Sequence, residues 1–282
     1  MSFATIDYRS EDRIARIILN RPERLNAITT ELAADLRAAV QRANDDAEVG
    51  VIILSGAGRA FCAGYDLGWA VQAEAETQKS GGGHWDPVQD YLMMSKNVRV
   101  YMSLWESPKP VIAQVHGWCV GGGTDLALCS DLIYMADDAQ IGYPPARIWG
   151  EPTTMMWVYR LGLEHAKRLM LTGESLTGKE AERVGLASKS VPLAELSRTV
   201  DELAQKLATI PLNQLVMSKL LVNQAYENMG LRTTQMLGTI CDGIARHTPE
   251  GIAWRDDAMR DGFREAVRKR DAPFGDYGES KK

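Results

Sequence analysis

The chain has 282 residues, of which 45% are hydrophobic, so it can bury one large core with or without a smaller appendage. A net charge of −5 at pH 7 gives no electrostatic reason to bind nucleic acid or an anionic membrane. The four cysteines lack metal-binding spacing, and neither a signal peptide nor a membrane-spanning apolar run is found, which favours a cytoplasmic protein without a metal site.

The N-terminal part of the sequence alternates between strands and helices. Residues 5–22 predict two strands around a polar turn, and residues 29–46 predict a capped helix with apolar side chains at helical spacing. Residues 49–67, "VGVIILSGAGRAFCAGYDL", predict a buried strand that leads into a glycine-containing loop.

The same order recurs further along the chain. Residues 88–105 predict a helix, residues 109–117 a short buried strand, and residues 131–142 a pair of short strands. Units of strand, strand and helix that follow one another suggest a spiral of stacked repeats rather than a doubly wound sheet.

Residues 117–131, "GWCVGGGTDLALCSD", join the end of a predicted strand to the start of a helix. Thr124 and Asp125 have the place of helix-starting residues before a compact apolar run. Backbone N–H groups at such a junction lack partners, and the helix dipole adds positive potential. We therefore expect the loop to attract negative charge, the alternative being glycines that only allow the helix to pack closely on the sheet.

A transient anion fits this loop better than a bound phosphate. The sequence lacks the G-x-x-x-x-G-K-[ST] and G-x-G-x-x-G patterns there, and Asp125 would repel a phosphate. A carbonyl that becomes an oxyanion only in the transition state could be stabilised by N–H donors while Asp125 handles a proton. The glycine-containing loop that ends at residue 67 offers a second donor, so the two loops together predict an oxyanion hole.

From residue 193 onward the sequence predicts only helices. Residues 193–210, 212–229, 232–247 and 250–270 each show an amphipathic pattern. A helical region without a core of its own must bury its apolar faces against the strand-rich part or against another subunit. We therefore expect a homo-oligomer.

Five segments, in this order, resemble the crotonase, or enoyl-CoA hydratase/isomerase, superfamily: "LNRPERLNAI", "GAGRAFCAGYDL", "KPVIAQVHGWCVGGGTDLALCSDLIYMADDAQIG", "LTGESLTGKEAERVGLASKSV" and "REAVRKRDAPF". The resemblance implies an α/β fold, a crotonase-like spiral of ββα repeats over residues 1–192 that holds a CoA-thioester site. It also implies a C-terminal helical region, residues 193–282, that builds a homotrimer or a dimer of trimers. Family members act on acyl-CoA thioesters without a metal or redox cofactor, CoA being part of the substrate.

The resemblance also assigns site residues. It gives the oxyanion-hole donors as the backbone N–H groups of Tyr65 and Gly122, and it matches Asp125 to the first of two catalytic acids in hydratases. The expected contacts to CoA and substrate include Phe263 and Lys269 in the last helices, which would serve this subunit or a neighbour. The remaining expected contacts are Arg24 and the loop residues Ala63, Gly64, Tyr65, Asp66 and Leu67.

The sequence departs from the family at the second acid. Hydratases carry a glutamate in the segment written here "GYPPARIWGEP", and this chain has Pro145 there. Glu151 is the nearest following carboxylate, and it falls where some relatives, including a chlorobenzoyl-CoA dehalogenase, carry a functional aspartate. We therefore expect Asp125 and Glu151 as the catalytic pair, the alternative for Glu151 being a residue that only complements a helix N-terminus.

The resemblance implies an acyl-CoA hydratase or dehydratase, or an enoyl-CoA isomerase. Water addition suits two carboxylates of unequal pKa, whereas a double-bond shift needs only one. The alternatives are a CoA-thioester hydrolase or dehalogenase-like enzyme that uses Glu151, and a non-catalytic binding protein that keeps the fold. Tyr143, Trp149, Met155, Met156 and Trp157 are candidates either for the substrate pocket or for the core.

Overall fold

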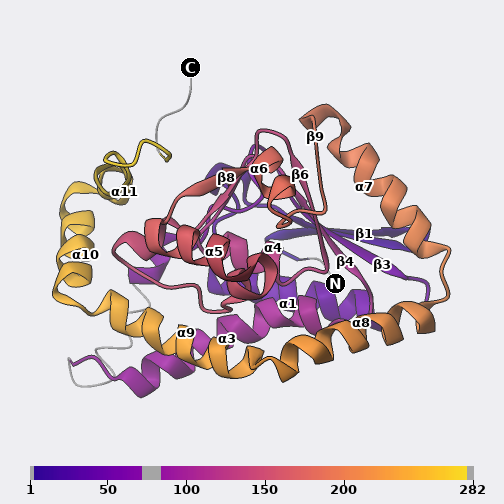
Figure 1. Cartoon of the computed structure of the whole chain (residues 1–282), viewed down its shortest axis with the longest axis horizontal. Helices are drawn as coiled ribbons and strands as arrows, with labels where there is room; N and C mark the ends of the chain where they lie inside the picture. Colours follow the sequence, from indigo (N-terminus) through magenta and orange to yellow (C-terminus); the bar gives the residue numbers. More distant parts are fainter. Residues whose placement is uncertain (1–2, 72–83, 278–282) are drawn as a thin grey trace.

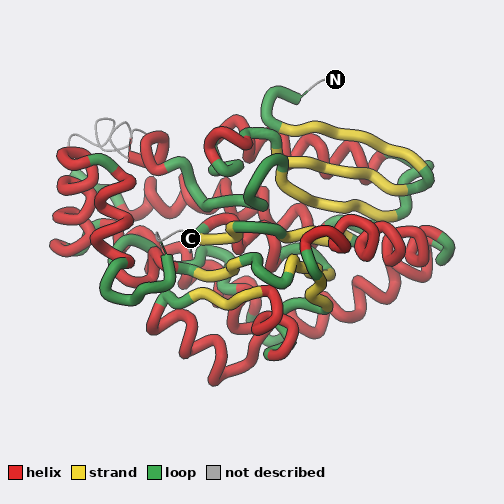
Figure 2. The backbone as a smooth tube through the Cα atoms, turned by 90° about the horizontal axis from the view of Figure 1, so that it is seen from above, coloured by secondary structure: helices red, strands yellow, loops and turns green. Residues whose placement is uncertain are grey.

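The computed structural model describes residues 3–71 and 84–277, and its larger sheet has six strands (Figure 1). The first two strands are antiparallel, and each later strand runs parallel to its neighbours. In spatial order the strands are β1 (Ile6–Glu11), β2 (Ile14–Leu19), β3 (Val51–Gly56), β4 (Val111–Val115), β6 (Leu132–Ala136) and β9 (Lys189–Val191). Figure 2 shows the long first strands side by side near the N-terminus.

A smaller sheet of three strands completes the spiral. Its strands, in order, are β5 (Trp118–Val120), β7 (Gln140–Gly142) and β8 (Ser175–Thr177). The chain passes from β4 to β5 and from β6 to β7, so each turn of the spiral adds a strand to both sheets. After β3 the loop joins the same stack through a parallel bridge between Cys62 and Cys119 of β5. This arrangement confirms the predicted spiral of ββα repeats.

Helices follow the strand pairs and close the core. They are α1 (Thr30–Asp45), α3 (Pro87–Glu106), α4 (Gly122–Leu128), α5 (Met156–Thr172) and α6 (Gly178–Arg183), with 3₁₀ helices η1 (Pro22–Arg24) and η2 (Pro144–Arg147). The start of α1 is capped as predicted, because the Thr29 side chain accepts a hydrogen bond from the Leu32 N–H. The core between sheets and helices is continuous, and Trp157 of α5 is its largest fully buried side chain.

The C-terminal region is helical, as predicted. It contains α7 (Leu193–Ala208), α8 (Leu212–Asn228), α9 (Leu231–Arg246), α10 (Pro249–Asp261) and α11 (Phe263–Asp271). The helix predicted over residues 250–270 is in fact two helices, because Gly262 has a φ of 92° and a ψ of 142°, which no helical residue adopts. Among the described residues, no helix has the length and apolar character needed to cross a membrane.

The helical region does not form a separate core. α7 lies beside the larger sheet, and its buried residues Leu196, Val200 and Ala204 belong to the same core as the strands. α9 lies against α3, and α8 continues the line of α9 along one edge of the molecule (Figure 1). The predicted division at residue 193 therefore marks the end of the strands rather than the edge of a hydrophobic core.

Candidate active site

Two glycine-containing loops meet at the ends of strands. Backbone hydrogen bonds join them: the Cys62 N–H donates to the Trp118 carbonyl at 3.0 Å, and the Val120 N–H donates to the Cys62 carbonyl at 3.1 Å. A Cβ atom on Gly64 would lie 2.9 Å from the Val120 carbonyl oxygen, and one on Gly123 would lie 2.3 Å from the Cys62 carbonyl oxygen. Glycine is therefore required at both positions for the backbones to approach this closely.

The sequence predicted that the glycine loop at residues 121–123 directly follows the strand at residues 109–117. This prediction is wrong. The glycines follow β5, a three-residue strand that was not predicted and that pairs with β7. Gly121 has a φ of 54° and a ψ of −131°, so it turns the chain from β5 into α4 in a conformation that favours glycine.

Two backbone N–H groups lie side by side at this junction. Gly122 is the first residue of α4, so its N–H has no acceptor within the helix. A Cβ atom on Gly64 would lie 3.4 Å from the Gly122 nitrogen, so the peptide between Gly64 and Tyr65 lies beside the Gly122 N–H. Within residues 3–71 and 84–277, neither the Tyr65 N–H nor the Gly122 N–H donates to a backbone carbonyl outside the regular elements. Neither group is therefore engaged by such a carbonyl.

Asn26 holds the first loop in place and was not singled out from the sequence. Its side chain is fully buried, and its Nδ2 donates to the carbonyl oxygens of Ala57 at 2.9 Å, Ala60 at 2.8 Å and Phe61 at 3.2 Å. These bonds tie the turn after β3 to the segment that follows η1. Asn26 does occur in the motif "LNRPERLNAI", which was the available signal.

A cavity of about 430 Å³ opens in front of the two loops. Among the predicted binding residues, Ala63, Gly64, Tyr65 and Leu67 line it, as does Gly122. The Tyr65 ring stacks on Trp69 at 6.3 Å between ring centres, and its hydroxyl accepts a hydrogen bond from Tyr101 at 2.7 Å. Apolar side chains form most of the remaining wall, which suits an acyl chain or an aromatic group.

The aromatic and methionine candidates divide between the cavity and the core. Tyr143 and Trp149 line the cavity, whereas Met156 and Trp157 are buried in the main core. Met155 does neither, since it lies against Gly238 of α9, where a Cβ atom would come within 2.5 Å of the Met155 Cγ.

Asp125 lies in the first turn of α4 and is fully buried. The Thr154 hydroxyl donates to its Oδ1, whereas its Oδ2 has no hydrogen-bond partner among the described residues. Burial raises the pKa of Asp125 to about 7, with a further contribution from the negative charge of Asp242. A carboxyl group with this pKa can hold or release a proton near neutral pH. Asp125 itself does not line the cavity, but Gly122, one turn earlier, does.

Glu151 precedes α5 and contributes mainly through its backbone. Its N–H donates to Asp242 Oδ1 at 3.1 Å, and its carbonyl accepts from the Tyr143 hydroxyl at 2.8 Å. Burial, together with the charge of Asp242, raises the pKa of the Glu151 carboxyl. The Glu151 side chain does not line the cavity. It also lies outside the first turn of α5, which begins at Met156, so the helix-complementing alternative is wrong.

Pro145 forms part of the cavity wall at the place of the family's second acid. A Cβ atom on Gly121 would lie 3.7 Å from the Pro145 Cγ, so the proline ring faces the second glycine loop. The wall opposite this loop is therefore apolar at the position where hydratases carry the second catalytic acid.

Two predicted CoA contacts from the N-terminal part of the chain lie outside the cavity wall. Arg24, at the end of η1, is exposed, and it is not part of the cavity wall. Asp66 forms an ion pair with Arg21 at 3.2 Å and accepts a hydrogen bond from the Trp69 N–H at 3.4 Å. Asp66 is thus engaged in fixing the loop.

The last helices approach the cavity, but not through the predicted residues. Phe263 packs against a small apolar cluster that includes Trp149 and Trp254, and Lys269 is exposed and forms an ion pair with Asp261 at 3.0 Å. From α11 and the segment after it, the residues that line the cavity are Val267, Arg270, Asp271 and Tyr277.

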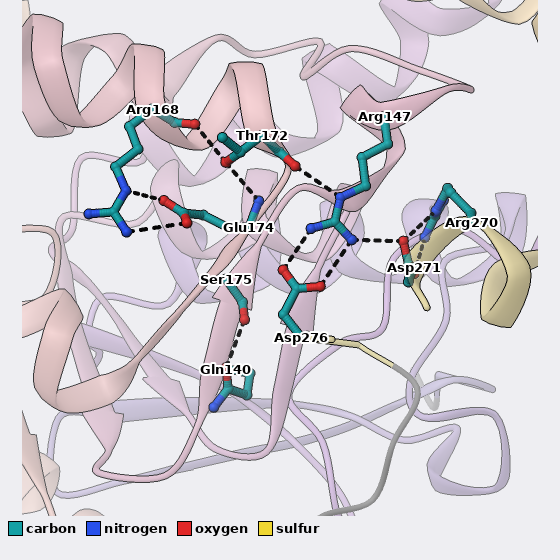
Figure 3. A network of polar contacts seen from close by, with 9 residues as sticks. All are labelled: Gln140, Arg147, Arg168, Thr172, Glu174, Ser175, Arg270, Asp271 and Asp276. Carbon is teal, nitrogen blue, oxygen red and sulfur yellow. Dashed lines mark hydrogen bonds and ion pairs between the residues drawn. The ribbon is translucent and has the colours of Figure 1, made fainter. Parts of the chain in front are cut away.

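A buried ion-pair network fixes the segment after α11 (Figure 3). Arg147 of η2 donates to Asp271 at 3.0 Å and to Asp276 at 2.6 Å, and Arg270 donates to Asp271 at 2.8 Å. The Arg147 side chain is only 4% exposed and that of Asp271 is fully buried. This network connects the C-terminal segment to the spiral. It was not predicted, since Arg147 is more than 120 residues away in the chain from Asp271 and Asp276.

Two further polar residues line the cavity from α9 and were also missed. Asp242 and Arg246 are one helical turn apart, both buried, and joined by an ion pair at 3.2 Å. Arg246 also pairs with Asp90 of α3 at 2.7 Å. Within the part of the chain that the structure describes, no group of three or more His, Cys, Asp or Glu side chains is placed to hold a metal ion.

Comparison with known proteins agrees with this architecture. A crystal structure of an enoyl-CoA hydratase from Mycobacterium smegmatis shares 46% of the sequence, with a TM-score of 0.92 over 98% of this chain and 96% of that chain. An enoyl-CoA hydratase/isomerase from Xanthobacter autotrophicus Py2 shares 30%, with a TM-score of 0.88 over 97% of this chain and 99% of that chain. The hydroxycinnamoyl-CoA hydratase-lyase of Pseudomonas fluorescens is 32% identical over 213 residues, 72% of each chain.

The family model described as enoyl-CoA hydratase/isomerase matches residues 9–239. That range includes both sheets except the first residues of β1, and both glycine-containing loops. With its spiral fold and paired loops, the chain belongs to the enoyl-CoA hydratase/isomerase family of the crotonase superfamily.

Proposed function

We propose that the chain adds water to an enoyl-CoA thioester, removes it in the reverse direction, or shifts a double bond in such a thioester. The observation that supports this most is the pair of unengaged N–H groups of Tyr65 and Gly122 at the wall of a largely apolar cavity. Two convergent donors stabilise a thioester oxygen most strongly when negative charge develops on it. The family to which the chain belongs is consistent with this chemistry.

In the proposed reaction the thioester oxygen accepts hydrogen bonds from both N–H groups. In a double-bond shift, a carboxylate removes a proton from one carbon, the electron pair moves to the thioester oxygen as an enolate, and the proton returns to another carbon. In hydration, the oxygen of water bonds to Cβ and loses a proton to a carboxylate, while Cα gains a proton. Both routes pass through the same enolate, which the two donors hold.

Asp125 is the acid/base group that the geometry supports best among the predicted residues. Its fully buried carboxyl, with a pKa of about 7 and one unpartnered oxygen, can exchange a proton near neutral pH. Neither Asp125 nor Glu151 is in the cavity wall, but Asp125 lies one turn after Gly122, which is, whereas Glu151 is supported by its raised pKa alone. For the same reason, no observation favours the hydrolytic or dehalogenase-like alternative, in which Glu151 would be the nucleophile or base.

Ala63, Gly64 and Leu67 are proposed to contact CoA, because they line the cavity next to the donors. Phe263 and Lys269 would serve a CoA molecule bound outside this cavity, in this subunit or a neighbour. The acyl-CoA substrate, the trimeric assembly and the cytoplasmic location all stay predictions.

A matched pair of variants at Gly122 tests the oxyanion hole. Gly122→Pro removes the N–H, and turnover of a panel of enoyl-CoA thioesters is expected to fall by at least ~100-fold. Gly122→Ala keeps the N–H but adds a Cβ atom, which would meet the Tyr65 ring at 2.9 Å, so it measures the steric part of the effect. Equal losses in both variants would show that the N–H is not a donor to substrate.

The non-catalytic alternative is tested by binding. A family member that has become a scaffold could lose affinity for CoA, whereas the proposed enzyme binds CoA thioesters in the cavity next to Gly64. Isothermal titration with CoA and butyryl-CoA, followed by mass spectrometry of the thioester after incubation, separates the two. Binding with no chemical change on any enoyl-, 3-hydroxyacyl- or aryl-CoA would contradict the proposed activity.

A further inference from the structure

We propose that Asp242 of α9 supplies the second acid/base group of the cavity, in place of the carboxylate that Pro145 replaces. This inference rests on the proposed function and extends it to a helix of the C-terminal region. Asp242 would act as the base that receives a proton from water or substrate, and Asp125 would act as the acid.

The position of Asp242 supports this role. Asp242, Pro145, Tyr143 and Gly122 all line the same cavity. A Cβ atom on Gly150 would lie 3.0 Å from Asp242 Oδ1, 3.5 Å from the Pro145 Cβ and 3.9 Å from the Tyr143 hydroxyl. The carboxylate therefore stands next to the proline that occupies the usual acid position. Pro145 in turn faces the second glycine loop. Asp242 is therefore connected to this loop along the cavity wall through Pro145.

The contacts of Asp242 orient its carboxylate and leave it able to accept further hydrogen bonds. Oδ1 accepts from the Glu151 N–H at 3.1 Å, and Oδ2 accepts from Arg246 Nε at 3.2 Å. An ionised carboxylate has about four acceptor positions, so these two bonds leave capacity for water or substrate. The residue is only 4% exposed, so its orientation is set by these contacts rather than by solvent. A base held in this way is preorganised for proton transfer.

The charges around Asp242 separate its behaviour from that of Asp125. Arg246 pairs with Asp242 and, at 2.7 and 2.9 Å, with both oxygens of Asp90, which also accepts from the Trp85 Nε1 at 3.3 Å. Arg246 lies within ion-pair distance of Asp242 and favours its ionised form, whereas Asp125 forms no ion pair among the described residues. Two carboxyl groups in such unequal surroundings are suited to act as base and acid.

Several titratable groups face Asp242 from neighbouring elements. They are Arg246 on the same helix, Asp90 on α3, Glu151 before α5, Asp125 on α4, and the tyrosines Tyr65 and Tyr143. Burial raises the pKa of Asp242 and the charge of Asp90 adds to the rise, while Arg246 and the Glu151 N–H lower it. The ionisation of Asp242 is thus opposed mainly by burial, and Arg246 and Asp90 shift it in opposite directions.

In the hydration direction the proton transfers balance as follows. The oxygen of water bonds to Cβ and its proton passes to Asp242, while the electron pair of the double bond moves to the thioester oxygen. Protonated Asp125 then gives its proton to Cα and the enolate returns to a thioester. The proton on Asp242 then passes to Asp125, directly or by exchange through solvent, so that both carboxyl groups regain their starting protonation before the next turnover.

Asp242→Asn tests the proposal because it keeps the shape of the side chain and removes the base. We expect kcat for the hydration of an enoyl-CoA to fall ~100-fold or more. KM and the affinity for butyryl-CoA should change less than ~3-fold. Asp256→Asn on α10, which removes an exposed carboxylate, is the matched control and is expected to keep wild-type turnover. An Asp242→Asn variant with the wild-type kcat, or one that loses only substrate affinity, would overturn the proposal.

A second variant covers the case in which Asp242→Asn does not fold. Asp90→Asn removes the negative charge that raises the pKa of Asp242, so the acid limb of the kcat/KM profile should move to lower pH. A purely structural role of the cluster would lower activity at all pH values alike, and an unmoved limb would overturn the proposal.

The two proposals fail in different ways. If the wild type exchanges the Cα protons of butyryl-CoA with D₂O and Gly122→Pro abolishes this exchange, the oxyanion hole stands whatever Asp242 does. If Asp242→Asn then hydrates enoyl-CoA like the wild type, only the Asp242 assignment is wrong. If the wild type neither exchanges protons nor converts any thioester, both proposals are wrong.

Discussion

Asp125 combines complete burial with an oxygen that has no hydrogen-bond partner among the described residues. Its ionised form is therefore poorly solvated, and the folded protein holds the proton up to about pH 7, whereas an unfolded chain releases it near the ordinary value of 3.8. The group destabilises the fold when it is ionised. The side chain that is proposed to transfer protons therefore lowers the free energy of unfolding at neutral pH.

This gives a prediction for stability against pH. The folded state binds more protons than the unfolded state between about pH 4 and 7, so the contribution of Asp125 to stability must fall as pH rises through that window. The expected slope is on the order of 1 kcal/mol per pH unit. Urea unfolding of wild type and Asp125→Asn at fixed protein concentration measures it, since the variant lacks this slope. A difference between the two proteins that is constant with pH would show that Asp125 is ionised throughout.

At the scale of elements, the C-terminal segment is attached by few but deeply buried contacts. α11 follows the break at Gly262 and ends at Asp271, where Arg147 and Arg270 meet its carboxylate. Arg147 also stacks on Phe274, with its guanidinium 3.9 Å from the ring centre. Because Val267, Arg270 and Tyr277 line the cavity, the position of this segment determines the shape of one wall.

Arg147→Ala should therefore release the segment after α11. The variant removes one of the two cations of the fully buried Asp271 and the Arg147 partner of the partly buried Asp276, and breaking a buried pair typically costs up to about 3 to 5 kcal/mol. We expect faster amide hydrogen exchange over residues 263–277, with exchange in β3 and β4 unchanged. Arg168→Ala is the matched control, because Arg168 is 64% exposed and its pair with Glu174 contributes little. Similar exchange in the two variants would argue against the network as the anchor.

At the scale of the whole molecule, α8 and α9 present apolar side chains to the outside. On α8, Leu220 is 63% exposed and Leu221 is 75% exposed, and on α9, Leu237 is 59% and Ile244 is 50% exposed. The two helices run along one edge of the molecule (Figure 1), and we call their exposed apolar side chains the apolar margin. A margin of this kind is typical of a surface that another subunit covers.

The predicted trimer, or a multiple of it, follows from this margin. Light scattering at micromolar concentration should give a mass three or six times that of one chain, and Leu237→Asp should lower it. Leu171→Asp serves as the control, because Leu171 is 83% exposed near the C-terminal end of α5 and is not part of the margin, so it should leave the mass unchanged. A monomeric wild type at this concentration would contradict the prediction.

The sequence predicted the features that depend on neighbouring residues. Gly64, Gly122 and Asp125 stand in short motifs whose strand-loop-helix pattern is local, and the structure brings the two loops together as expected. The pairing of Asp242 with Glu151, 91 residues apart, and of Arg246 with Asp90, 156 residues apart, has no local signature. On an amphipathic helix such as α9, a buried Asp and Arg one turn apart read as part of the polar face. Only the packing of α9 on α3 shows that they face inward.

α9 has one face toward the cavity and one toward the outside. Asp242 and Arg246 face the cavity, whereas Leu237, Ile240 and Ile244 face outward from the same helix. If a second subunit covers the outward face, any shift of α9 is felt on both sides. By thermodynamic reciprocity, association that changes ligand affinity by some factor requires that ligand binding change the association constant by the same factor. Where association strengthens substrate binding, substrate favours the assembly that dilution dissociates.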